Sequence, residues 1–172
     1  GHLWVTGRGH TTIGDNYMIH KYDMNGLWLN SFPQNVSSPN VGGWGGRDME
    51  ADDASNTLWV GNDNGHVEVM TYDPTTGGLI YSSTMMTGVP TTVRALCLNT
   101  TSGNFFTKSF TGDMYEFDST GAVINSIVNA AVSAYGFGWD ATNGTIWSST
   151  TGAAATEIDP VTGNETGRTF ST

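Results

Sequence analysis

One unit recurs four times along this chain, and its period limits the possible folds more than any other feature. Each copy has an Asp or Asn that opens a polar turn, an apolar–aromatic pair, a loop of small polar residues and an Asp–Gly turn. The first copy lacks the opening turn. The four copies are LWVTGRGHTTIGDNYMIHKYDMNG (3–26), DDASNTLWVGNDNGHVEVMTYDPTTG (52–77), NTTSGNFFTKSFTGDMYEFDSTG (99–121) and WDATNGTIWSSTTGAAATEIDPVTG (139–163).

Two independent landmarks give the same period. The apolar–aromatic pairs are spaced by 55, 47 and 41 residues, and the Asp residues of the second turn by 50, 45 and 41. Self-similarity at this period is typical of the blades of a β-propeller. The pairs are Leu3–Trp4, Leu58–Trp59, Phe105–Phe106 and Ile146–Trp147, and the turn residues are Asp23, Asp73, Asp118 and Asp159.

Each unit divides into four short strands, A to D, from the inside of a blade to its outside. Strand A is small and apolar, strand B carries the aromatic pair, and strand C alternates with period two, as in 66–72. Asp, Pro and Gly between C and D are turn formers. We expect A strands at 45–50, 93–98 and 136–139, and D strands at 27–32, 79–83, 123–128 and 166–170. The first unit lacks strand A, so the prediction is fifteen strands.

Composition supports this fold class and excludes some partners. Only 13% of the residues are charged, and Gly, Ser, Thr and Asn take their place, which favours strands and tight turns over helices. The net charge is -10 with six Lys and Arg, so the chain lacks the basic surface that nucleic acid requires. No apolar run is long enough to insert in a membrane. The single cysteine, Cys97, lies in an apolar run and is expected to be buried.

The repeats resemble a broad group of secreted bacterial and archaeal β-propellers, related to WD-repeat, NHL, YVTN and streptogramin-lyase-like proteins. The resemblance covers nearly the whole chain and implies the architecture, not an activity, because propellers host many functions. The expected fold is all-β: a propeller of about four four-stranded blades, the first without its innermost strand, in units 3–43, 44–91, 92–134 and 135–172. A β-sandwich or β-solenoid is the alternative.

An arc of this kind exposes two apolar blade faces, which aggregate or find a partner. We expect the arc to close with further copies of itself, with the remaining blades of a larger propeller, or as a compact four-bladed ring. In the last case the segment 168–172 would supply the missing strand. The chain is therefore either a single propeller domain or part of one, and a homo-oligomer is expected if the arc is open.

The candidate binding residues lie on the face that carries the B–C and D–A loops. Two long loops, 7–16 and 31–44, fall there, and variable loops on one face are where repeat proteins bind. Trp28 and Trp44 depart from the repeat pattern and are candidates for stacking on a ligand. The ligand-binding candidates are Arg8, His10, Asp15, Trp28, Trp44 and Arg47.

Other polar residues have two interpretations each. Asp63 and Asn64 could bind calcium, but Asn–Gly between strands also indicates a tight turn, so we expect no cofactor, with calcium as the alternative. His10, His20 and His66 lack ligand spacing and are expected at the surface. The cluster of Asp48, Glu50, Asp52 and Asp53 contains enough carboxylate for acid–base catalysis, but Asp52 is interpreted as a turn former and Asp53 as solvated.

The leading hypothesis is a non-enzymatic recognition or assembly module of an extracellular or cell-surface protein. It would bind a protein or glycan ligand, or other copies of itself, through the loop-rich face or the blade edges. One alternative is a lyase- or hydrolase-like propeller enzyme with its site at the channel mouth; another is a self-assembling structural subunit. The catalytic candidates of the enzyme hypothesis are His10, Arg47, Glu50, His66 and Arg94.

Overall fold

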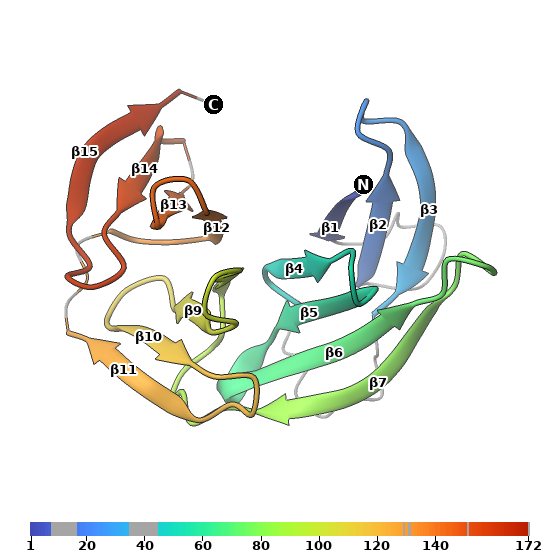
Figure 1. The fold of residues 1–172 in the computed structure, drawn as a ribbon, viewed down its shortest axis with the longest axis horizontal. Coiled ribbons are helices and arrows are strands. Elements are labelled where there is room, and N and C mark those ends of the chain that lie inside the picture. Colours follow the sequence, from blue (N-terminus) through green and yellow to red (C-terminus); the bar gives the residue numbers. More distant parts are fainter. Residues whose placement is uncertain (8–16, 35–44, 129, 131, 151, 172) are drawn as a thin grey trace.

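The computed structural model consists of four antiparallel sheets arranged around a common centre (Figure 1). It describes residues 1–7, 17–34, 45–128, 130, 132–150 and 152–171. Fifteen strands are present in these residues, as the repeat predicts.

The sheets, here called blades 1 to 4, follow one another along the chain. Blade 1 contains β1 (Leu3–Gly7), β2 (Met18–Tyr22) and β3 (Trp28–Pro33); blade 2 contains β4 (Met49–Asp52), β5 (Thr57–Gly61), β6 (His66–Tyr72) and β7 (Leu79–Met86); blade 3 contains β8 (Ala95–Leu98), β9 (Phe105–Lys108), β10 (Met114–Phe117) and β11 (Val123–Ile127); blade 4 contains β12 (Gly136–Asp140), β13 (Thr145–Ser149), β14 (Ala155–Ile158) and β15 (Glu165–Phe170).

The strand order within each sheet is the order along the chain. Figure 1 shows β1, β4 and β12 toward the centre and β3, β7, β11 and β15 on the outside. Two of the A strands begin later than predicted. Before β4 the chain turns at Gly45, which has a φ of 69°, and Gly46 donates to the Gln34 side chain at 2.7 Å, so this stretch lies against blade 1 before the strand begins.

The Asp and Asn residues of the repeat form the turns as expected. At each A–B and C–D turn the side-chain oxygen accepts from the backbone N–H two residues later, which stabilises the turn. In the C–D turns, Asp73 accepts from Thr75 at 2.8 Å, and Asp159 accepts from Val161 at 2.7 Å. In the A–B turns, Asn99 and Asp140 make the same contact at 2.9 Å. Hydrogen bonds in these turns lower the pKa of the aspartates. The largest cause of the decrease is the Asn143 side chain for Asp140 and the Thr76 hydroxyl for Asp73.

Apolar side chains fill the spaces between neighbouring blades. The cluster between blades 3 and 4 includes Phe106 and Trp139, whose rings stack with centroids 6.0 Å apart. Trp59 and Phe105 pack edge to face at 5.3 Å between blades 2 and 3. Burial of these clusters holds the four sheets together. The cluster between blades 1 and 2 is built on Ile19, Leu58, Val60 and Met70.

The glycine of the C–D turn also joins neighbouring blades. Gly121 has a φ of 89°, and a Cβ at this position would lie 2.5 Å from the Met86 carbonyl oxygen at the end of the preceding outer strand. Its own carbonyl accepts from Gly88 N–H at 2.9 Å. At Gly163 a Cβ would lie 2.7 Å from Ile127. At these two positions the chain therefore needs glycine for close approach between blades as well as for the turn.

The expectation that residues 168–172 supply the missing strand of blade 1 is wrong for the described part of this segment. Thr169 pairs with Thr156 and Phe170 with Ala155, so β15 is the outer strand of blade 4. Thr172 lies outside the described residues. In Figure 1, blades 1 and 4 stand on either side of an opening, and β1 and β12 do not form one sheet.

Candidate functional site

Arg47 lies on the loop-rich face, just before the inner strand of blade 2. Its guanidinium is 3.7 Å from the Asp63 carboxylate, and both side chains are partly buried. Burial lowers the pKa of Arg47, and the positive charge of Arg94 adds to the decrease. The two arginines thus share one electrostatic environment, and the structure brings these two predicted residues together.

Arg94 takes part in an aromatic cluster that the sequence did not predict. Its guanidinium carbon lies 5.3 Å from the Tyr135 ring centroid and 5.9 Å from that of Phe110. The two rings are 5.1 Å apart, and 43% of Tyr135 and 39% of Phe110 are exposed. They come from a B–C loop and a D–A loop, which explains why residues distant in sequence meet here. Partly exposed Arg and aromatic groups of this kind are common in protein interfaces.

The segment around Asp63 forms a short 3₁₀ turn, Asp63–Gly65, between β5 and β6. Asn64 adopts a positive φ of 58°, and the Asp63 carboxylate accepts from Thr92 at 3.2 Å while facing Arg47. Within the described residues, no group of three or more His, Cys, Asp or Glu side chains is arranged to hold a metal ion. The Asp63 carboxylate suggested for calcium therefore already accepts from Thr92 and pairs with Arg47.

His66 is buried, in contrast to the expectation of a surface histidine, with only 7% exposed. Its Nδ1 lies 2.9 Å from the Asp63 carbonyl oxygen, which places the ring against the 3₁₀ turn. His20 is partly buried, and its Nδ1 lies 2.7 Å from the Ser31 hydroxyl. Neither contact resembles an acid–base pair at a cavity.

Trp28 lies on the outer strand of blade 1, away from the channel mouth. It is 57% exposed, and its indole N–H donates to Ser31 at 2.9 Å. The other ligand-binding candidates on the long loops lie outside the described residues. They are Arg8, His10, Asp15 and Trp44.

Asp48 and Glu50 lie on and beside the innermost strand of blade 2, toward the centre of the arc. Asp48 Oδ2 accepts from the backbone N–H groups of Leu96 and Phe137, each at 2.8 Å, so one carboxylate connects blades 2, 3 and 4. Burial raises the pKa of Asp48 to about 6, although these hydrogen bonds oppose the shift. The sequence analysis considered Asp48 only as part of a possible acid–base cluster and missed this structural role.

Glu50 lines a cavity of about 290 Å³ on the opposite face, where the A–B and C–D turns lie. Burial raises its pKa to about 8, and the nearby Asp48 carboxylate adds to the increase. At neutral pH the Glu50 side chain is therefore largely protonated. Glu50 thus belongs to the turn face, separate from Arg47 and Arg94 on the loop-rich face.

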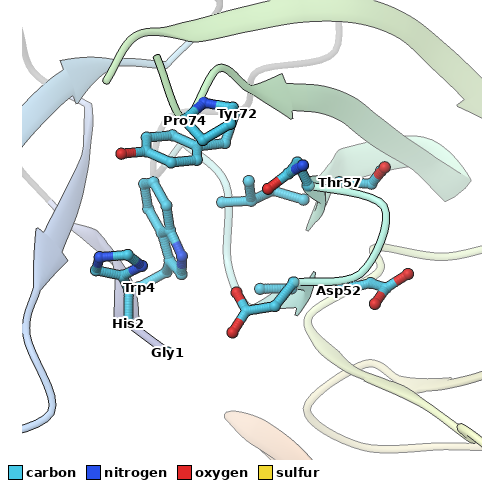
Figure 2. A pocket seen from close by; sticks show the side chains of 11 residues that line it. Gly1, His2, Trp4, Asp52, Thr57, Tyr72 and Pro74 are labelled. Carbon is cyan, nitrogen blue, oxygen red and sulfur yellow. The ribbon is translucent and has the colours of Figure 1, made fainter. Parts of the chain in front are cut away.

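A second cavity on the turn face lies between blades 1 and 2 and was also missed by the sequence reasoning. It has a volume of about 250 Å³. Figure 2 shows His2, Trp4 and Tyr72 on one side, with Asp52 and Thr57 across from them. Trp4 and Tyr72 pack edge to face, with ring centroids 5.2 Å apart. The repeat identifies Trp4 only as a core residue, so its exposure to a cavity could not be read from its position.

The rings of this cavity already bind one cation of the protein itself. The Lys21 ammonium lies 3.8 Å from the Tyr72 centroid and 5.4 Å from that of Trp4, and it donates to the Tyr72 hydroxyl. Lys21 is only 5% exposed and does not line the cavity. Burial lowers the pKa of His2, and the positive charge of Lys21 is the second largest cause of this decrease. Asp53, which lines the cavity opposite, opposes that shift.

The two ends of the arc form a third candidate surface. In each aromatic pair the first residue faces the preceding blade, and at this position Leu58, Phe105 and Ile146 are at most 2% exposed. The equivalent residue of blade 1, Leu3, is 44% exposed, and Val5 on the same side of β1 is 48% exposed. Leu3 therefore lacks among the described residues the covering blade that its three equivalents have.

The opposite end of the arc presents the second residue of the last aromatic pair. Trp147 lies on the outward side of blade 4, 5.0 Å from the Phe170 ring and 5.4 Å from the Arg168 guanidinium carbon. Arg168 donates to Glu157 at 2.6 Å. In the interior of the arc the equivalent residues contact the next blade, as Trp59 contacts Phe105. Leu3 at one end and Trp147 at the other are thus the two partners of a contact that the chain forms between its inner blades, as between Phe105 and Trp59.

Comparison with solved structures agrees with this arrangement of sheets. The WD40 β-propeller domain of Doa1 matches with a TM-score of 0.57 and 14% identity, over 90% of this chain and 47% of that chain. The fold is that of a β-propeller. A chain in the crystal structure of the mitotic checkpoint complex matches this propeller with a TM-score of 0.52 and 16% identity, over 87% of this chain and 43% of that one.

The propeller spans less than half the length of each of these neighbours. No family model matches the sequence, and a search of curated proteins found no match. Among the described residues no helix is long and apolar enough to cross a membrane.

Proposed function

We propose that this chain is a non-enzymatic recognition and assembly module, and that a second copy completes its two open blade faces. The observation that carries the proposal is the exposure of Leu3, which is 44%, against 0–2% for its three equivalents. Apolar faces of this kind in propellers are normally covered by a neighbouring blade, and their burial drives association.

The second copy is favoured because the two ends complement each other. Trp147 of one copy would face Leu3 of the other, as Trp59 faces Phe105 within the chain. The end of β15 would approach the turn at Gly26, where a Cβ would meet no described atom within 4 Å. This reproduces the contact of Gly121 with the end of β7.

The size of the arc also fits a partner of its own kind. The chain covers 43% and 47% of the two neighbouring chains, so two copies supply about the amount of structure found in one of them. Contacts of this head-to-tail type close into a ring when the rotation is right and otherwise form filaments. Two copies contribute eight sheets, four from each chain.

The mass of the 172-residue chain in solution tests the proposal. Light scattering after size exclusion should give twice 18.3 kDa at two protein concentrations. Leu3→Asp should give a monomer, because it places a charge in the interface. Val161→Asp is the matched control: it changes an apolar residue that is 76% exposed in the C–D turn of blade 4, and it should leave the mass unchanged.

Each other outcome has a definite meaning. A wild-type monomer of 18.3 kDa at both concentrations overturns assembly with a second copy. A mass that grows with protein concentration would support the head-to-tail contact between copies, but it would overturn the closure of a ring by two copies. Circular dichroism of Leu3→Asp, with an unchanged β spectrum, separates loss of assembly from loss of folding.

The loop-rich face is the proposed site for a further protein ligand. Arg94, Tyr135 and Phe110 supply a partly exposed Arg–aromatic cluster beside the ion pair of Arg47 and Asp63. A secreted or cell-surface location would be consistent with the few lysines and the high content of Thr, Asn and Gly. Detection of the native protein in the extracellular fraction of its host tests that location.

The enzyme alternative is supported only by the raised pKa of Glu50 beside a cavity, since perturbed acids are common in active sites. The buried Asp48 accounts for part of that shift without any catalytic role. Loss of a measured lyase or hydrolase activity in Glu50→Gln, with folding intact, would favour the enzyme over the module.

A further inference from the structure

The cavity between blades 1 and 2 combines aromatic faces with carboxylates. Figure 2 shows the rings of His2, Trp4 and Tyr72 in its wall, and the lining also contains the carboxylates of Asp52 and Asp53. With about 250 Å³, it is smaller than the roughly 300–1,000 Å³ of sites for drug-sized ligands, so it suits one side chain rather than a cofactor. We propose that this cavity binds the guanidinium group of an arginine from a partner protein.

The charges around the cavity favour a cation. Asp52 remains ionised, because the Ser55 hydroxyl and the Ala54 N–H lower its pKa. Asp53 is exposed and adds a second negative charge. The buried Lys21 and the terminal amine of Gly1 each place a positive charge near His2, whereas Asp53 and Asp23 each place a negative charge there. With Asp52 in the cavity lining, three carboxylates oppose two cations. The chain as a whole has a net charge of -10, which attracts a basic partner at long range.

The aromatic rings are suited to the same class of ligand. A cation over the face of Trp or Tyr within about 6 Å of the centroid is attracted by the π electrons. Lys21 shows this attraction at the same two rings, at 5.4 Å from Trp4 and 3.8 Å from Tyr72.

Arginine is preferred over lysine because its planar guanidinium can stack on a ring and bind a carboxylate at the same time. The protein itself uses this combination in blade 4. Arg168 lies 5.4 Å from the Trp147 centroid and donates to Glu157 at 2.6 Å. The cavity offers a Trp ring and the exposed Asp53 carboxylate in a similar combination, without an arginine of its own among the lining residues.

Titration with capped amino acids tests the proposal without an identified partner. The probes are Nα-acetyl-arginine methylamide, the equivalent lysine compound and the uncharged isostere Nα-acetyl-citrulline methylamide. The indole N–H signal of Trp4, assigned by its loss in Trp4→Phe, reports binding by NMR. The arginine probe should shift this signal with a Kd on the order of 1 mM, since one side chain supplies only a few kcal/mol.

The variants separate the cavity from nonspecific charge effects. Asp53→Asn should weaken binding of the arginine probe about five-fold, while Glu165→Gln removes a distant exposed carboxylate and should leave it unchanged. Equal shifts with arginine and citrulline, or no effect of Asp53→Asn, would overturn the proposal. Equal affinity for the lysine probe would overturn the preference for guanidinium. Because both walls of the cavity belong to one chain, these results do not depend on whether the protein is a dimer.

Discussion

The Asp48 carboxylate accepts a hydrogen bond at 2.8 Å from the backbone N–H of Phe137, which lies 89 residues further along the chain. The same oxygen accepts from Leu96 at 2.8 Å. One side chain of blade 2 thereby fixes the inner strands of blades 3 and 4. Because hydrogen bonds to a charged group are stronger than neutral ones, this contact is expected to contribute strongly to the closure of the inner arc.

Asp48→Ala should lower the free energy of unfolding by about 3 kcal/mol, because it removes the acceptor of the Leu96 and Phe137 N–H groups and a further acceptor of the Met49 N–H. Asp48→Asn keeps one acceptor oxygen and should cost less than half as much. Urea denaturation followed by tryptophan fluorescence measures both. Equal losses in the two variants would show that the carboxylate charge, rather than the acceptor geometry, holds the blades.

Stability should fall as the pH rises from about 4.5 to about 8. The pKa of Glu50 is raised to about 8 in the folded chain from an ordinary 4.5, so the folded state binds the proton more tightly. The contribution of this group is complete below the unfolded pKa and is lost as the pH rises through the folded pKa. The raised pKa of Asp48, about 6, acts in the same direction at lower pH.

Glu50→Gln removes most of this dependence and should raise the melting temperature at pH 8 by about 2–4 °C, equivalent to at least 1 kcal/mol. Glu165→Gln is the control, because it removes the same charge from an exposed position. Thermal scans at pH 5 and pH 8 give the comparison. A slope that persists in Glu50→Gln would assign the effect to the overall negative charge.

Gly121→Ala should be at least twice as destabilising as Gly103→Ala. Both glycines have a positive φ, which costs an alanine about 1–2 kcal/mol. Only at Gly121 does the new Cβ also approach the backbone of the preceding blade, at 2.5 Å from the Met86 carbonyl. At Gly103 no described atom lies within 4 Å. Similar losses in urea denaturation would show that the outer strand can move away at little cost.

Lys21→Met should raise the pKa of His2, because Lys21 is the second largest cause that lowers it. The same change should strengthen binding of the arginine probe about three-fold, since it removes a positive charge behind the rings. Titration of the His2 ring signal by NMR and the Trp4 shift measure the two effects. An unchanged His2 pKa would mean that burial and the Gly1 amine lower it without Lys21.

The blade pattern could be predicted from the sequence because it depends on local chemistry. The turn at Asp159 and the alternation of 66–72 act within a few residues, and both appear in the structure. Among the described residues the first sheet has three strands, and the sequence also predicts this because its first copy starts with the aromatic pair of strand B.

The contacts between blades could not be predicted in the same way. Which side chain meets which depends on the twist and spacing of whole sheets. Asp48 reaches Phe137, and Trp4 reaches Tyr72, only after the blades have packed. The aromatic cluster at Arg94 depends on two loops from different blades for the same reason.

Cys97 is the only cysteine of the chain, and it is completely buried in the inner strand of blade 3. Burial raises the pKa of its thiol well above the ordinary value, and the Glu50 and Asp48 carboxylates add to the increase. Only the thiolate reacts with disulfide reagents, so labelling requires the blades to separate first. Cys97 is therefore a probe of local opening. The rate at which a thiol reagent modifies it in the absence of denaturant reports how often the innermost strands become accessible.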